Sequence, residues 1–349
     1  MAAPRRILLI RPSALGDVCR SVAILASLRR AYPAARIDWL VQDTFLDAVR
    51  AHPALSGVVP FPRADLARAM RRGGATSLLK WLARLREPRY ELVIDAQGLF
   101  RSAFFAWATG ARDRVGHRRA RELGWLFYTR RERGSEALHT VDRMLALVRE
   151  AGIDPVVDMS LYAPPEGIAW ACADHRIAEP FALFAPTSRW TGKQWPADRY
   201  RTVALRLLGD GLVARIAVVG GRNERQQCAP LLELAQRDGR VIDLVGETSI
   251  GGLMALVRRS ALVLANDSAA LHMAVGFERP LVGLFGPTRV ERVGPYGRSA
   301  DVIQHVHPGD RLDHKDAPGG LALMGRIGAD EVYEACAARL SRGAARTPA

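Results

Sequence analysis

Residues 261–288 constrain the fold of this chain more than any other segment. The apolar run 261–265 predicts a buried strand, and the polar triplet Asn266-Asp267-Ser268 behind it is typical of a helix N-cap. A short helix over 269–275 and a second strand over 280–285 complete a βαβ unit, which requires a parallel sheet covered by helices. Ligands bind at the carboxyl ends of such strands, and a helix N-terminus there favours an anion such as phosphate.

The same alternation of strands and helices fills the rest of the chain in two series. The first series has strands expected at 5–11, 36–41, 57–61 and 91–95, and helices expected at 18–31, 43–51, 77–85, from 101 onward, and at 140–151. The second has strands at 181–184, 215–219 and 241–244, and helices at 197–208, 226–236 and 250–258, before the unit at 261–288. Residues 305–328 are expected to be irregular and residues 329–340 to form a last helix.

These two series predict an α/β protein with two Rossmann-like domains whose parallel sheets face an interdomain cleft. The proline-rich stretch around Pro164 and Pro165 suggests the boundary. We expect an N-terminal domain at 1–160, a linker at 161–180, a C-terminal domain at 181–328, and a helix with a basic tail at 329–349.

Composition limits the class of partner. The four cysteines lack CxxC spacing and the eight histidines lack ligand spacing, so we expect neither a disulfide framework nor a protein-bound metal. No apolar run approaches the roughly 18 residues of a membrane span, and the N-terminal run 7–10 is too short for a signal peptide, which predicts a cytoplasmic protein.

The formal net charge is +14, although an arginine-rich codon bias would by itself explain the excess of arginine. Such a charge favours polyanionic partners. The arginines are dispersed and no nucleic-acid-binding motif accompanies them, so we expect an anionic membrane surface or a lipid-linked anionic substrate and not nucleic acid.

Two loops of the N-terminal series carry candidate chemistry. Arg11 to Val18 follows the first strand and places Gly16 beside Asp17, whose carboxylate either serves a ligand or only caps the next helix. Asp95-Ala-Gln-Gly98 follows the fourth strand and is either a second ligand loop or a capped turn. Neither loop has the GxGxxG pattern of a dinucleotide site, so a nicotinamide cofactor is not expected.

Three loops of the C-terminal series suit a phosphorylated ligand. Thr187, Ser188 and Lys193 follow the strand at 181–184, where hydroxyls and a compact ammonium suit phosphate oxygens, although a solvated loop is the alternative. Asn223 and Glu224 follow Gly220-Gly221, where they form either a ribose site or an ordinary turn. His272 lies one turn into the helix behind Ser268, where a packed structural histidine is the alternative to a ligand-binding one.

Taken in order, these segments resemble a known family. The segments that carry the likeness are Pro12-Ser-Ala-Leu-Gly-Asp17-Val, Val93-Ile-Asp95-Ala-Gln-Gly98, Trp190-Thr-Gly-Lys193-Gln-Trp195-Pro196, Asn266-Asp-Ser-Ala-Ala-Leu-His272, Phe285-Gly-Pro-Thr288 and Gly294-Pro-Tyr296-Gly297. From about residue 5 to 340 the chain is similar to glycosyltransferase family 9, the ADP-heptose:lipopolysaccharide heptosyltransferases, and closer to heptosyltransferase I than to II. Ala269 stands where the family usually has glycine.

The resemblance implies a GT-B fold with the acceptor on the N-terminal domain and the nucleotide-sugar on the C-terminal domain. It implies an inverting enzyme that needs no metal and no cofactor and moves L-glycero-D-manno-heptose from ADP-heptose to Kdo on lipid A or to a core heptose. The enzyme would be peripheral on the cytoplasmic face of the inner membrane. The alternatives are another GT-B transferase or an epimerase that uses a different nucleotide-sugar, and a non-catalytic anionic-glycolipid binder.

The resemblance also assigns roles to residues. It implies Asp17 as general base and Lys193 as the group that stabilises the departing diphosphate. Arg11, Ser13 and Arg101 are expected on the acceptor side. The expected donor-binding set is Thr187, Ser188, Lys193, Asn223, Glu224, Asp267, Ser268 and His272.

Overall fold

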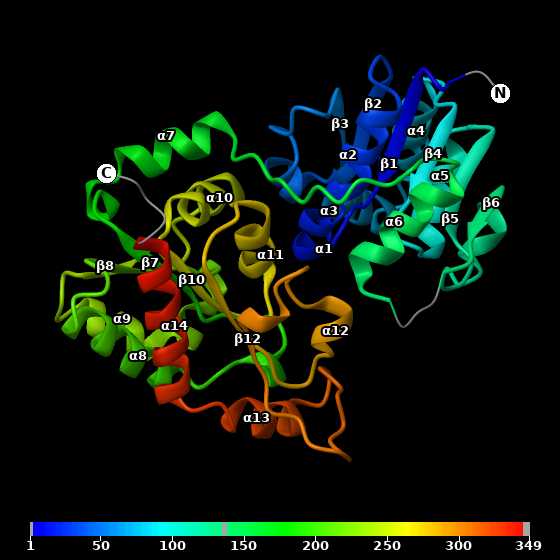
Figure 1. Ribbon diagram of the computed structural model, residues 1–349. Helices are drawn as coiled ribbons and strands as arrows, with labels where there is room; N and C mark the ends of the chain where they lie inside the picture. The colour runs from blue at the N-terminus through cyan, green and yellow to red at the C-terminus, as the bar shows by residue number, and fades with distance from the viewer. Residues whose placement is uncertain (1–2, 135–137, 345–349) are drawn as a thin grey trace. The chain divides into compact units, whose positions relative to one another are not determined.

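A computed structural model describes residues 3–134 and 138–344 of the chain (Figure 1). The chain divides into two compact units between Tyr162 and Ala163. Each unit is built on a six-stranded parallel sheet, which confirms the expected α/β class and its two Rossmann-like series.

The first unit has the strand order 3-2-1-4-5-6. In spatial order the strands are β3 (Gly57–Phe61), β2 (Arg36–Gln42), β1 (Arg6–Ile10), β4 (Leu92–Asp95), β5 (Asp113–His117) and β6 (Arg130–Glu132). The helices and short 3₁₀ turns are α1 (Leu15–Arg20), α2 (Val22–Ala31), η1 (Asp43–Ala48), α3 (Arg63–Arg71), α4 (Ala75–Arg86), α5 (Phe100–Ala108), η2 (Gly124–Phe127) and α6 (Thr140–Glu150). The central strands β1 and β4 are apolar and buried almost throughout, as helices on both faces of a parallel sheet require.

The second unit has the same strand order, 3-2-1-4-5-6, when its strands are numbered within the unit and read from β9 to β12. In spatial order its strands are β12 (Val302–Ile303), β11 (Leu281–Leu284), β10 (Leu262–Asn266), β7 (Phe181–Ala185), β8 (Arg215–Val218) and β9 (Val241–Asp243). Its helices and 3₁₀ turns are α7 (Pro165–Ala173), η3 (His175–Ile177), η4 (Thr191–Lys193), α8 (Ala197–Gly209), η5 (Arg222–Cys228), α9 (Ala229–Ala235), α10 (Ile250–Arg259), α11 (Ala269–Gly276), α12 (Val290–Val293), η6 (Ser299–Asp301), α13 (Ala317–Gly325) and α14 (Ala329–Ala344).

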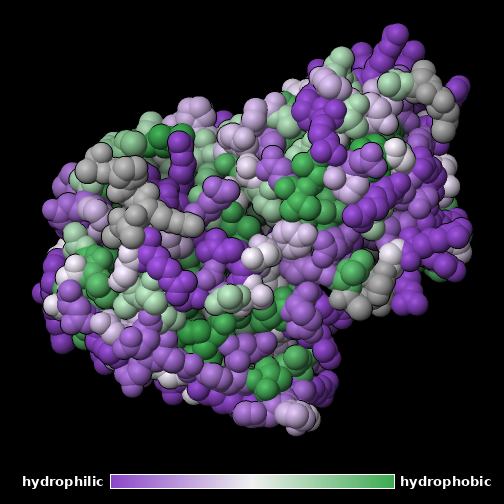
Figure 2. Space-filling model, in the orientation of Figure 1, coloured by the Kyte–Doolittle hydropathy of each residue, from purple (hydrophilic) through white to green (hydrophobic). Residues whose placement is uncertain are grey.

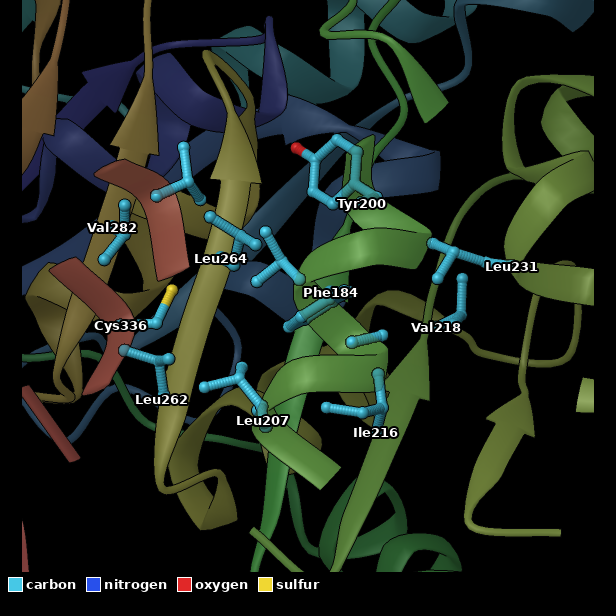
Figure 3. Packing of buried hydrophobic residues seen from close by; sticks show 14 of the residues in the cluster. Phe184, Tyr200, Leu207, Ile216, Val218, Leu231, Leu262, Leu264, Val282 and Cys336 are labelled. Atoms are coloured by element: carbon cyan, nitrogen blue, oxygen red, sulfur yellow. The ribbon is translucent and has the colours of Figure 1, made fainter. Parts of the chain in front are cut away.

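One face of the second sheet is covered by α8 and α14. Phe184, Leu264 and Val282 of the sheet pack with Tyr200 of α8 and Cys336 of α14 in a continuous apolar cluster (Figure 3). Helix α14 is therefore part of the core of the second unit, although the periodicity of 329–340 did not indicate where it would pack.

Several local predictions are wrong. The helix expected at 18–31 is two helices that meet at Ser21, and the helix expected at 43–51 is only the 3₁₀ turn η1. Strands β5 and β6 were not predicted, because these short outer strands carry arginines and no apolar run. The supposedly irregular stretch 305–328 contains α13, whose Pro-Gly-Gly start hides the helical period.

The expected linker at 161–180 also contains a helix. Helix α7 starts with Pro165 in the first turn, where a missing N–H does no harm, and packs against α10 of the second unit. A β-carbon on Gly167 would lie 2.3 Å from the carbonyl oxygen of Gly251, so the two helices meet backbone to backbone. Residues 165–173 of the expected linker are therefore a helix that packs on the second unit.

Candidate active site

In each sheet the strand order reverses between two central strands, β1 and β4 in the first unit and β7 and β10 in the second. The candidate residues lie in the loops after these strands. In the first sheet Ile10 of β1 lies opposite Asp95 of β4. In the second sheet Ala185 of β7 lies opposite Ala265 of β10. The loops that follow the two strands of each pair therefore start next to each other, at the point where open α/β sheets bind their ligands.

Asp17 lies between two buried arginines in the first of these places. Its Oδ2 is 2.6 Å from an Nη of Arg11, and its Oδ1 forms an ion pair with Arg20. Burial raises the pKa of the Asp17 carboxyl, but the charges and hydrogen bonds of Arg11 and Arg20 outweigh it and hold this pKa well below its usual range. Asp17 is therefore an ionised carboxylate at neutral pH and does more than cap a helix. Arg20, one helical turn after Asp17, was not among the predicted site residues.

The loop after β4 holds the loop after β1. Arg11 also donates to the carbonyl oxygen of Ala96, and the backbone N–H of Ser13 donates to Oε1 of Gln97 at 3.2 Å. Of the predicted acceptor residues, Arg11 thus pairs with Asp17, although its buried Nε has no hydrogen-bond partner among the described residues, and Ser13 is held by its backbone N–H.

Asp95 shapes that second loop from inside. Its buried carboxylate accepts hydrogen bonds from the Tyr128 hydroxyl at 2.6 Å and from the Gln97 N–H at 2.8 Å. Burial raises the pKa of Asp95, although these hydrogen bonds lower it in part. Gly98 then has φ +68°, the left-handed region that glycine favours. Asp95 thus forms the capped turn that is one of the two interpretations of this loop.

Arg101, the third predicted acceptor residue, begins α5 directly behind this loop. It is exposed, and its guanidinium carbon lies 5.4 Å from the ring centroid of Phe61. Burial, and then the nearby charge of Arg63, lower its pKa. Arg101 thus stacks on an aromatic ring and is not part of the ion pairs of Asp17.

Lys193 and Asp267 meet in the second unit. Lys193 Nζ is 2.6 Å from Oδ2 of Asp267, and the side chains are only 15% and 10% exposed. The pair joins the loop after β7 to the loop after β10 across 74 residues of sequence. Lys193 is thus not on a solvated loop, and a cation stands beside the N-terminus of α11.

Asn266 holds the same two loops together. Its Nδ2 donates to the carbonyl oxygen of Pro186 at 2.5 Å, and its Oδ1 accepts from the Tyr200 hydroxyl at 3.0 Å and from the Trp195 N–H at 3.3 Å. The side chain is fully buried. The sequence indicates Asn266 only as part of an N-cap, although an amide at the end of an apolar strand is itself a sign of a buried polar contact.

Helix α13 supports the turn η4 that carries Lys193. A β-carbon on Gly192 would lie 3.0 Å from the carbonyl oxygen of Asp316, and one on Gly320 would lie 2.5 Å from the carbonyl oxygen of Gly192. Trp190 stacks edge-on against His314 with ring centroids 4.9 Å apart. These contacts were missed because 305–328 was expected to be irregular.

Thr187 and Ser188 are 9% and 6% exposed. The Ser188 N–H donates to Oε1 of Gln227 at 3.0 Å, and a β-carbon on Gly220 would lie 2.8 Å from Cγ2 of Thr187. The loops after β7 and β8 are therefore in contact, and glycine at 220 permits it.

The other predicted donor residues lie around these loops. Asn223 is exposed on η5, while Glu224 accepts the Gly221 N–H at 2.7 Å as a local cap. His272 is 6% exposed within α11. The buried hydroxyl of Ser268, at the N-terminus of α11, has no hydrogen-bond partner among the residues that the structure describes.

Within residues 3–134 and 138–344, no group of three or more His, Cys, Asp or Glu side chains is placed to hold a metal ion. No helix in the described part of the chain is long and apolar enough to cross a membrane. The four cysteines are free thiols, of which only Cys172 is exposed.

Comparison with known proteins gives a consistent result. The sequence model of glycosyltransferase family 9 (heptosyltransferase) matches residues 78–317. Lipopolysaccharide heptosyltransferase 1 of Pseudomonas aeruginosa is 30% identical over 307 residues, which cover 84% of this chain and 82% of that protein. Lipopolysaccharide heptosyltransferase 1 of Escherichia coli strain RS218 is 25% identical over 326 residues, which cover 89% of this chain and 94% of that protein.

A solved structure shares the fold. Escherichia coli ADP-heptose lps heptosyltransferase II superposes with a TM-score of 0.79 at 22% sequence identity, over 97% of this chain and 99% of that one.

Proposed function

The chain belongs to glycosyltransferase family 9, the heptosyltransferases, and we propose that it transfers heptose from ADP-L-glycero-D-manno-heptose to the inner core of lipopolysaccharide, either Kdo-lipid A or a core heptose. The observation that carries the proposal is the buried Lys193–Asp267 pair, which lies at the ligand-binding edge of the second sheet and within the matched residues. It offers a cation for a diphosphate and a carboxylate for sugar hydroxyls in one place.

In the proposed reaction Asp17 is the general base. The acceptor hydroxyl gives its proton to the Asp17 carboxylate while its oxygen bonds to the anomeric carbon of heptose from the face opposite the diphosphate. The bond from that carbon to the diphosphate oxygen breaks, ADP leaves with the electron pair, and the configuration inverts. A carboxylate within hydrogen-bond reach can take this proton.

The ion pairs of Asp17 give this base a particular requirement. A carboxylate whose pKa lies far below neutrality accepts a proton weakly, because general-base efficiency follows basicity. An anionic group on the acceptor that takes up part of the charge of Arg11 or Arg20 raises the pKa of Asp17. This supports an acceptor that carries a carboxylate or a phosphate, with Arg11, Ser13 and Arg101 on its side of the reaction.

In the second unit Lys193 and the backbone around Thr187 and Ser188 would hold the diphosphate and stabilise the charge that develops on ADP. Preorganised donors at a developing charge lower the barrier without reorganisation. The unpartnered hydroxyl of Ser268 and the N-terminus of α11 suit a phosphate oxygen. Asp267 would bind heptose hydroxyls, with His272 behind it, and Asn223 or Glu224 would reach the ribose.

We also propose that the protein works without a metal and lies on the cytoplasmic face of the inner membrane. The net charge of +14 supports attraction to an anionic leaflet. The ammonium of Lys193 supports charge neutralisation by protein groups alone.

The test is titration calorimetry with ADP-heptose against ADP, UDP-glucose and GDP-mannose, all in EDTA. We expect ADP-heptose to bind most tightly and Lys193→Ala to weaken it by about 10–100-fold, as loss of a charged hydrogen bond does. Preference for UDP-glucose or GDP-mannose would reject the donor. Binding that requires added Mg²⁺ would reject metal independence. Turnover on Kdo-lipid A and on heptosylated core then separates the two acceptors.

A further inference from the structure

Helix α5 and the turn η2 of the first unit expose an unusual group of apolar side chains. The face drawn in Figure 2 is largely polar, with apolar residues in scattered patches. Phe100 and Trp107 of α5 are 45% and 53% exposed, and Leu123, directly before η2, and Leu126 of η2 are 61% and 57% exposed; α5 and η2 are in contact. We call these four residues, together with Phe104 and Phe127, the aromatic face.

The aromatic face is continuous. Phe100, Phe104 and Trp107 lie on one side of α5, at spacings of four and three residues. The ring of Phe127 from η2 lies against all three, with centroid distances of 5.4, 6.0 and 6.2 Å. The rings support one another, so the outermost side chains are held outward by packing.

The backbone holds Leu123 at the surface. Glu122 and Leu123 have φ angles of +57° and +60°, the left-handed region that non-glycine residues rarely adopt. A β-carbon on Gly124 would lie 3.1 Å from the carbonyl carbon of Leu99, so this turn is pressed onto the start of α5. Strained backbone of this kind persists where the surrounding structure fixes it, often at a functional surface.

The segments that carry the aromatic face are also rich in arginine. Arg101 of α5 is exposed, and the stretch 118–131 carries four exposed arginines, Arg118, Arg119, Arg121 and Arg131, against the single exposed acidic residue Glu122. Arg131 lies 4.8 Å above the ring of Trp125. Aromatic and leucine side chains flanked by arginine are the chemistry that binds the interface of an anionic bilayer.

We propose that the aromatic face of α5 and η2 docks the protein on an anionic lipid bilayer. This proposal rests on the proposed function, because an enzyme with a lipid-linked acceptor must reach the membrane surface. The aromatic face also lies close to the acceptor-side loops. The backbone N–H of Arg121, three residues before η2, donates to the carbonyl oxygen of Gly98 at 3.0 Å. Gly98 ends the loop that holds Arg11 and Ser13. Docking therefore brings the acceptor side of the active site to the lipid surface.

The experiment is co-sedimentation of the full chain with vesicles of phosphatidylcholine alone or with about 30% phosphatidylglycerol, at low and high salt. We expect binding to the anionic vesicles and weaker binding at high salt. Trp107→Ser/Leu126→Ser should lower the partition coefficient at least about tenfold, because it removes the interfacial side chains. The matched control Val157→Ser/Leu205→Ser changes two residues that are 61% and 46% exposed elsewhere and should bind as the wild type does.

Activity separates this inference from the proposed function. With a deacylated, water-soluble acceptor the double variant should turn over like the wild type, while with acceptor embedded in vesicles it should lose at least about tenfold. Wild-type binding by the variant, equal binding to neutral vesicles, or a dimer that the variant dissociates would each overturn the docking proposal. Failure of the wild type to use either acceptor would instead reject the proposed function.

Discussion

Replacing Asp17 by asparagine should damage folding and catalysis at once, and the two effects can be separated. The carboxylate forms ion pairs with Arg11 and Arg20, which are each only 7% exposed. In the variant two buried guanidinium groups lose the negative charge that lies between them. Breaking a buried pair from one side typically costs about 3–5 kcal/mol.

The expected loss is near the lower end of that range. Each charge-assisted hydrogen bond contributes about 1.5–3 kcal/mol, and the amide oxygen of asparagine still accepts one bond from a guanidinium, of about 1.5 kcal/mol. The net loss is then about 3 kcal/mol in the free energy of unfolding of the first unit. For a unit of this size about 1 kcal/mol corresponds to 2–4 °C, so we expect the melting temperature to fall by roughly 6–12 °C.

The catalytic effect is expected to be larger than the stability effect explains. Loss of a general base lowers turnover by about 10²–10⁴-fold. Adding Arg20→Met to Asp17→Asn removes one of the two opposed charges, so the double variant should melt above the single variant and remain equally inactive. Asp65→Asn, which removes a pair that is 3.8 Å long with both side chains more than half exposed, should cost less than about 0.5 kcal/mol.

The assay is thermal unfolding followed by circular dichroism, together with initial rates measured well below each melting temperature. Asp17→Asn with wild-type stability would refute the argument from the buried ion pairs. Retained turnover in a folded variant would refute the role of Asp17 as the base.

Three further predictions follow from particular contacts. Arg20→Met should raise the pKa of Asp17 and move the acid limb of the kcat/KM profile to higher pH, because Arg20 lowers that pKa in the native protein; an unchanged limb would contradict this. Burial lowers the pKa of His52 in the folded protein from 6.5 to about 4. Between these two pH values the unfolded chain therefore binds a proton that the folded protein does not. Stability from this group is thus complete above pH 6.5 and falls by about 3 kcal/mol toward pH 4, and denaturant melts of His52→Gln should lack that loss. Gly192→Ala should cost about 1–3 kcal/mol and weaken donor binding in calorimetry, since its β-carbon meets the backbone at the start of α13, whereas Gly209→Ala, with open space around it, should do neither.

The sequence predicted the parts of the fold that have strong apolar periodicity. The strands at β1, β2, β4, β7 and β10 are apolar runs in which nearly every residue is buried, so their position and type were evident. Outer strands such as β6, Arg-Arg-Glu, have no such run, because only their pairing with a neighbour makes them strands. Helix α13 was not predicted for a related reason. Its glycines allow close contact with η4, and they weaken the helical pattern of the sequence.

The candidate site was predictable in its loops and not in its pairings. Motif order located Asp17, Lys193 and Asp267 at the ends of strands, and strand order then placed the last two together. Nothing in the sequence indicated that Arg20 would form a second ion pair with Asp17 or that Asn266 would bind the backbone of both Pro186 and Trp195. Such contacts depend on side-chain direction across elements, which a linear pattern does not contain.

The contact between Gly192 and Gly320 also orders events during synthesis. Lys193 is made soon after the middle of the chain, but the helix that holds its turn in place begins only at Ala317. Helix α14, which closes the core of the second sheet, comes later still. A growing chain thus cannot hold the turn of Lys193 in its final place until residues 317–325 have been made. A chain truncated before Ala317 would accordingly contain the whole first unit but lack both α13, which supports the Lys193 turn, and α14, which covers the second sheet.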